Sequence, residues 1–122
     1  HTRDICYRFC YHDLTMEKDL VKLVIYVPLT HAEKIRQVLG EQGAGHIGNY
    51  DFCSFSVQGV GRFRPLQGAH PAIGEVGKIE EVEEERIETV CHEGDLEKIL
   101  TEIRAAHPYE QPAINVYPLL SR

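Results

Sequence analysis

The chain has 122 residues, of which 43% are hydrophobic and 26% are charged, and its formal net charge is −6. That length fits a single domain with a real core, and no apolar run approaches the roughly 20 residues that a membrane helix needs. The acidic balance argues against a broad nucleic-acid-binding surface, so we expect neither nucleic acid nor a membrane as a partner.

The first 15 residues differ from the rest of the chain and lack the apolar segment and cleavage site of a signal peptide. Met16, the only methionine, immediately precedes a plausible domain start. We therefore divide the chain into an extension or tag-like tail over residues 1–15, expected to be disordered, and a single domain over residues 16–122. The tail also holds residue types that ligate metals, namely Cys6, Cys10 and His12. Disorder is the better-supported interpretation of so sparse a triplet.

Residues 21–27 are rich in β-branched side chains and end at a proline, which predicts a mostly buried strand. Thr30 and Glu33 have the spacing of a capping box, so we expect a helix to begin there with both side chains bonding free amides. One face of this helix is apolar, through Ala32, Ile35, Val38 and Leu39. Gly40 and Gly43 are expected to end it.

A glycine-rich turn over residues 43–48 leads into a second strand, predicted over residues 50–57. Alternation places Cys53, Phe55 and Val57 on its buried face. Residues 59–77 are dense in glycine and proline, which excludes a long helix. A loop of this length in a small domain is usually functional or mobile.

The segment 79–91 is ambiguous, because its apolar residues fit both periodicities. A helical face would contain Ile79, Val82, Arg86 and Val90, whereas a strand face would contain Ile87, Thr89 and Cys91. We favour the strand, because a helix would leave too few strands for a sheet. The next apolar residues, spaced i, i+3, i+4 and i+7, predict a helix from Gly94 to about Ala106, and residues 113–117 predict a last strand. The helical residues are Leu96, Ile99, Leu100 and Ile103.

The run His-Pro-Tyr-Glu-Gln-Pro at residues 107–112 lies between that helix and the last strand. Each proline fixes a φ angle, removes an amide donor and pushes the residue before it out of the helical region. The chain must therefore run extended past Tyr109 and Glu110. Histidine, tyrosine and glutamate side chains are held on a stiff crossing, which suits either a site or a subunit contact.

These elements predict an α+β fold of the ferredoxin-like kind, ordered βαββαβ, with a four-stranded antiparallel sheet and two helices on one face. The other sheet face then has no partner within the chain. Substantial apolar surface there would need another subunit to cover it. We therefore expect a homo-oligomer.

Four stretches also form a pattern: GAGxIGxYxxCxF at 43–55, GxGxFxPxxGAxPxIG at 59–74, ExxExRIE at 81–88 and HPYExPA at 107–113. The pattern resembles the small module of YqfO-type proteins, which is similar to the trimeric CutA and PII proteins and is usually inserted in a larger protein with a dinuclear metal centre. The resemblance covers about residues 20–120 and implies a ferredoxin-like fold and a trimer. The chain carries no ligand set for two metals, so the hydrolase-type activity proposed for that centre is not carried over.

Two candidate sites follow from residue type. A divalent metal ion could be bound by His46, His70, His107 and Glu110, with Glu75 as a further oxygen ligand. No motif fixes their mutual geometry. The alternative is that His107 and Tyr109 pack at the helix end while Glu110 pairs with a base.

An anion or other small ligand could instead be bound by Gly59, Gly61, Arg62 and Arg64, whose amides and guanidinium groups suit phosphate, with Tyr109 beside them. The alternative is that the arginines pair with the acidic run at residues 80–88. No serine or cysteine stands in a nucleophile motif, which argues against catalysis.

We therefore predict a trimeric binding or regulatory module without catalysis of its own. Its ligand site is expected at subunit clefts lined by residues 43–48, 59–77 and 107–112. The alternative function is a divalent-metal-binding protein or metal-dependent hydrolase. The cysteines form no CxxC pair, which indicates a reduced protein of the cytoplasm with Cys53 and Cys91 buried.

Overall fold

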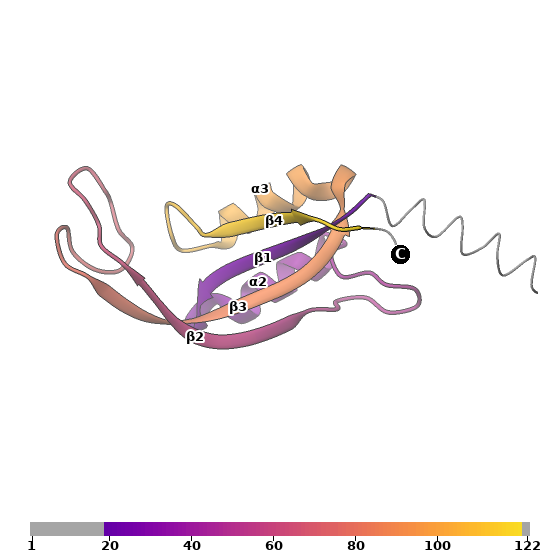
Figure 1. The fold of residues 1–122 in the computed structure, drawn as a ribbon, viewed down its shortest axis with the longest axis horizontal. Helices are drawn as coiled ribbons and strands as arrows, with labels where there is room; N and C mark the ends of the chain where they lie inside the picture. The colour runs from indigo at the N-terminus through magenta and orange to yellow at the C-terminus, as the bar shows by residue number, and fades with distance from the viewer. Residues whose placement is uncertain (1–18, 121–122) are drawn as a thin grey trace, which may run out of the picture.

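The computed structural model describes residues 19–120 (Figure 1). The tail predicted over residues 1–15, with its possible ligands, lies outside the described residues. Within them the elements are β1 (Leu20–Pro28), α2 (Leu29–Glu41), β2 (Phe55–Phe63), β3 (Glu80–His92), a 3-10 turn η1 (Glu93–Asp95), α3 (Leu96–Ala106) and β4 (Ile114–Pro118). No helix within residues 19–120 is long and apolar enough to cross a membrane.

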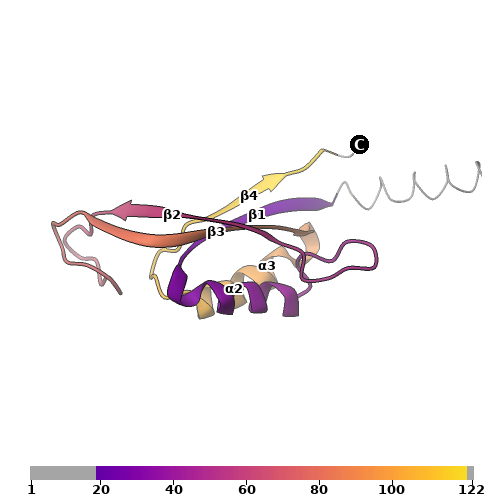
Figure 2. The same ribbon diagram turned by 90° about the horizontal axis from the view of Figure 1, so that it is seen from below.

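The four strands form one antiparallel sheet in the order β2-β3-β1-β4. Both helices lie against the same face of that sheet (Figure 2). The prediction of a ferredoxin-like βαββαβ fold is therefore confirmed, and so is the choice of strand for the ambiguous segment 79–91, which forms most of β3.

The core lies between the central strands and the helices. Alternate residues of β1 face the helices and are almost fully buried, as are the apolar stripes of α2 and α3. The core residues at its centre are Leu23, Ile25, Val27, Ile35, Ile87, Ile99 and Ile103. The acidic Glu85 is also buried on this side, where it pairs with Arg36 of α2. Both helical stripes predicted from periodicity are confirmed.

Strand β2 differs from its prediction. It begins at Phe55 and continues to Phe63, through the first part of the segment predicted to be a loop. Its predicted buried face is wrong, because Phe55 is 65% and Val57 50% exposed. The register explains why: Phe55 lies opposite Glu88, on the face of the sheet that the helices do not cover. Strand β1 pairs with β3 only as far as Glu84, whereas β2 pairs with it as far as Glu80. This end of the β2–β3 hairpin runs on as an arm past the helices (Figure 1).

Two smaller predictions also need correction. The capping box is wrong, because α2 begins at Leu29, directly after Pro28, and no side chain caps it. Thr30 therefore lies inside the first turn, and its hydroxyl is 2.9 Å from Nδ1 of His31. Cys91 is buried as expected, but Cys53 is only half-buried, because it precedes the exposed strand β2.

The open face of the sheet is mixed in character. At its centre Lys22 contacts Glu88 at 2.6 Å, and Arg86 contacts the same carboxylate at 3.0 Å. The hydrogen bond from Lys22 lowers the pKa of Glu88. The exposed apolar side chains lie to either side, with Phe55 and Val57 on β2 and Tyr117 on β4. The helices therefore leave this face open, as predicted, and its exposed apolar side chains lie on its flanks.

Candidate functional site

The crossing between α3 and β4 is anchored by His107. Its side chain is buried, its Nε2 lies 2.7 Å from the carbonyl oxygen of Tyr26, and its Nδ1 accepts the amide of Tyr109 at 3.2 Å. A neutral imidazole with its proton on Nε2 satisfies both contacts. Burial lowers the pKa of His107, which favours that neutral form.

Tyr109 joins the crossing to the β2–β3 arm. Its hydroxyl donates to Oε2 of Glu84 at 3.0 Å. Its ring meets the ring of Phe63 edge to face, with 5.6 Å between centroids and 62° between planes. Burial, followed by the hydrogen bond to the Glu84 carboxylate, raises the pKa of Tyr109, so it stays a neutral donor at physiological pH.

Glu110 joins the crossing to the long loop between β2 and β3. The amide of His70 donates to Oε1 of Glu110 at 2.9 Å. The loop also closes on itself, since the amide of Gly77 donates to the carbonyl of Pro65 at 2.8 Å. Residues 64–79 contain no helix or strand. The bond between Gly77 and Pro65 nevertheless joins the two ends of this loop, and the bond from His70 to Glu110 holds its middle against the crossing.

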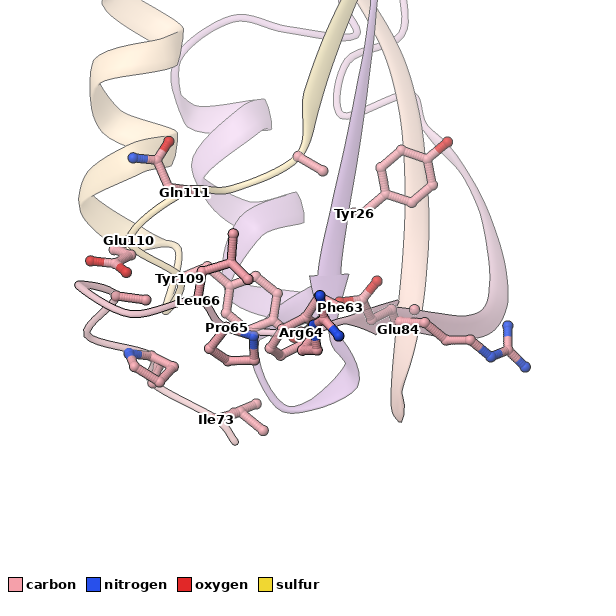
Figure 3. Close-up of a pocket in the computed structure, with 16 residues that line it drawn as sticks. Tyr26, Phe63, Arg64, Pro65, Leu66, Ile73, Glu84, Tyr109, Glu110 and Gln111 are labelled. Atoms are coloured by element: carbon pink, nitrogen blue, oxygen red, sulfur yellow. Dashed lines mark hydrogen bonds between the residues drawn. The ribbon is translucent and has the colours of Figure 1, made fainter. Parts of the chain in front are cut away.

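A groove of about 590 Å³ lies where the arm, the loop and the crossing meet (Figure 3). Its walls are largely apolar and include Phe63, Pro65, Leu66, Pro71, Ile73 and Tyr109. Its charged lining residues are Arg62, Arg64, Glu84 and Glu110. A second hollow of about 310 Å³ shares Tyr26, Gly61 and Glu84 with it, so the two adjoin.

The structure brings most of the predicted ligand-binding residues to this groove. Gly61, Arg62, Arg64 and Tyr109 line it, and Gly59 lines the adjoining hollow. The two glycines belong to strand β2 and lie opposite Glu84 and Val82 of β3, so they do not form the loop of accessible amides that the sequence indicated. Arg62 contacts Glu81 at 2.7 Å, as the alternative interpretation expected.

Phe63 and Ile73 fall within residues 59–77, which the sequence predicted to line the site, but neither was singled out, and Glu84 was missed. Phe63 and Ile73 fall within the GxGxFxP and GAxPxIG motifs, which could have indicated them. Glu84 lies within the acidic run of β3, and nothing in that run distinguishes it from its neighbours.

The predicted metal ligands do not converge within one subunit. His70 and Glu110 meet, but through the backbone amide of His70, and His107 already uses both ring nitrogens. The amide of Gly45, next to His46, donates to the carbonyl of Val90 near one end of β3. At roughly 3.3 Å per residue, Val90 lies about 30 Å from the other end of β3, where the long loop joins the strand. Glu75 contacts Lys78 at 3.1 Å. Within residues 19–120 no group of three or more candidate ligands is arranged to hold a metal ion.

Comparison with known proteins identifies relatives of this chain, although no protein-family model matches it. The curated relatives are proteins named GTP cyclohydrolase 1 type 2 homolog. The one from Halalkalibacterium halodurans is 48% identical over 105 residues, and that from Bacillus subtilis is 46% identical over 105. The one from Mycobacterium tuberculosis is 49% identical over 102 residues. These matches cover 84% to 86% of this chain, which spans only 27% to 28% of the relatives' length.

Solved structures agree. A Bacillus cereus protein related to NIF3 superposes with a TM-score of 0.73 at 46% identity, covering 84% of this chain and 26% of that one. The periplasmic divalent cation tolerance protein CutA from Archaeoglobus fulgidus superposes with a TM-score of 0.59 at 22% identity, covering 82% of this chain and 83% of its own, which shows a shared fold. The resemblance to the small module of YqfO-type proteins is thereby confirmed.

Proposed function

We propose that this chain, a homologue of one module of the GTP cyclohydrolase 1 type 2 homologs, is a binding or regulatory module that takes a small ligand in the groove. The observation that carries the proposal is the convergence of three segments distant in sequence: the end of β2, residues 64–73 and residues 109–113. A largely apolar hollow of this size with a few polar groups is typical of small-molecule sites.

The lining residues support binding without catalysis. They include no serine, threonine, cysteine, histidine or lysine, so the groove offers no aliphatic hydroxyl, thiol or amine nucleophile and no imidazole base. Tyr109 is held as a neutral donor, and the carboxylates of Glu84 and Glu110 each accept a hydrogen bond that maintains the fold. The cyclohydrolase activity named for the relatives is not part of this proposal.

The proposal includes assembly into a trimer in the cytoplasm. Three exposed apolar side chains, Phe55, Val57 and Tyr117, flank the sheet face that the helices leave open. Strands β2 and β4 are sheet edges with unpaired backbone groups. Three copies is the number that the resemblance to CutA-like modules implies. The free thiols of Cys53 and Cys91 fit a reducing compartment.

Ligand binding can be tested by native mass spectrometry of protein purified gently from cells. Ile73→Arg places a long cation in the groove that Ile73 lines, whereas Ile79→Arg makes the same change at an apolar residue that is 70% exposed and does not line it. Wild type and Ile79→Arg are expected to retain a small molecule that Ile73→Arg has lost. If wild type retains none and no compound of a metabolite library raises its melting temperature, the proposed function is wrong.

Assembly can be tested with a matched pair on β2. Val57 and Val60 are each 50% exposed, and their register places them on opposite faces of the strand. We expect Val57→Asp to lower the mass measured by light scattering after size exclusion and Val60→Asp to leave it at three subunits. A single-subunit mass for wild type at micromolar concentration, or an unchanged mass for Val57→Asp, would contradict assembly through this face.

A further inference from the structure

We infer that the groove selects a small organic acid, with one carboxylate held by Arg64 and an aromatic or branched aliphatic body held by the apolar walls. The inference rests on the proposed ligand-binding function and specifies the chemical class of the ligand.

The walls account for the body of the ligand. Phe63 and Tyr109 present aromatic surface to the groove, and the loop contributes Pro65, Leu66 and Ile73 (Figure 3). Pro65 is buried, and its ring restricts the backbone of the wall. A ligand with an apolar body would remove this surface from water, at about 25 cal/mol per Å² of apolar area buried.

The charged lining residues account for the carboxylate. Glu84 accepts the Tyr109 hydroxyl, Glu110 accepts the His70 amide, and Arg62 contacts Glu81 on the opposite face of the arm. Arg64 differs from these three, because its guanidinium makes no ion pair or side-chain hydrogen bond with any residue from 19 to 120. It is thus the lining cation available to a ligand, and a guanidinium binds a carboxylate through two parallel hydrogen bonds.

The same arrangement disfavours a phosphate dianion. Two carboxylates, those of Glu84 and Glu110, border the groove in which a single guanidinium is available, so a second negative charge would be repelled. Gly59 and Gly61 are part of the β2–β3 ladder, and they form no concave nest of amides of the kind that binds phosphate.

The test uses matched probes on the intact chain: 3-phenylpropionate and 4-methylpentanoate, their neutral primary amides, and phenyl phosphate. Binding is followed by calorimetry and by amide shifts in an NMR spectrum. We expect each acid to bind at least about tenfold more tightly than its amide and than phenyl phosphate, as one charged hydrogen-bonding group allows. The shifts should map to residues 61–73 and 109–113. Arg64→Gln should reduce the affinity for the acids about tenfold, to that of the amides. Arg104→Gln, an exposed arginine of α3 outside the groove, should not.

The outcomes separate this inference from the function on which it rests. Amides that bind as well as the acids, tighter binding of phenyl phosphate, or an Arg64→Gln variant with wild-type affinity would overturn the organic-acid assignment while leaving the groove a binding site. Absence of binding by both acids would also overturn it, and the proposed function would then stand or fall on the small molecule retained from cells.

Discussion

Replacing Tyr109 by phenylalanine removes one hydroxyl and tests whether the crossing holds the β2–β3 arm in place. The phenylalanine ring can keep the edge-to-face contact with Phe63, whose centroid lies 5.6 Å away. The loss is confined to the hydrogen bond of 3.0 Å from the Tyr109 hydroxyl to the carboxylate of Glu84. The substitution therefore isolates a contact between residues 25 apart in sequence.

The expected cost follows from the nature of that bond. Hydrogen bonds to charged groups contribute about 1.5–3 kcal/mol to stability. Tyr109 and Glu84 are both half-buried, so water can partly replace the lost donor and the lower end applies. A loss of about 1.5 kcal/mol should lower the melting temperature of a domain of this size by about 6 °C.

Urea unfolding measures the loss directly, and Tyr50→Phe is the matched control. Tyr50 is 74% exposed, and its hydroxyl has no hydrogen-bond partner within the described residues, so its loss should cost less than about 0.5 kcal/mol. In a Glu84→Gln background the cost of Tyr109→Phe should fall, because the acceptor is no longer charged. Equal costs for the two tyrosines, or an undiminished cost in that background, would refute the reasoning.

The remaining predictions concern backbone shape and pH. Gly45 and Gly43 both have positive φ angles, +78° and +94°, but a Cβ at Gly45 would lie 2.3 Å from the carbonyl oxygen of Cys53, whereas one at Gly43 meets nothing. Gly45→Ala should therefore destabilise the protein by about 1–3 kcal/mol more than Gly43→Ala in urea unfolding, and equal effects would contradict the turn geometry. His107→Gln addresses pH: burial holds the pKa of the folded imidazole below its ordinary 6.5, so the unfolded chain binds the proton more readily. The stability that neutral His107 contributes should be complete above about pH 6.5 and be lost as the pH falls towards its folded pKa. The difference in unfolding free energy between wild type and His107→Gln should shrink from pH 7.5 to 5, and a constant difference would count against this.

Much of the fold can be predicted because its signals are local. The apolar spacing of Ile99 and Ile103 indicates a helix, the β-branched run of β1 indicates a strand, and Pro108 ends α3 at the predicted position. The errors arose where tertiary pairing overrides local preference. Two glycines in residues 59–61 indicate a loop, yet pairing with β3 extends them into a strand. The spacing of Thr30 and Glu33 indicates a cap at Thr30, yet the N-cap of the helix is Pro28, two residues earlier.

The groove shows what local pattern cannot supply. The sequence by itself determined the two helices, strands β1 and β4 and the stiff crossing, and it indicated Arg64 and Tyr109 as residues with binding chemistry. Only the tertiary structure placed Glu84 beneath the Tyr109 hydroxyl and bound the amide of His70 to Glu110, 40 residues away along the chain. It also placed His46 near the Val90 end of β3, away from His70 and Glu75 in the loop that joins β2 to the other end of β3. Secondary structure follows from interactions over a few residues, whereas a site depends on which distant side chains packing brings together.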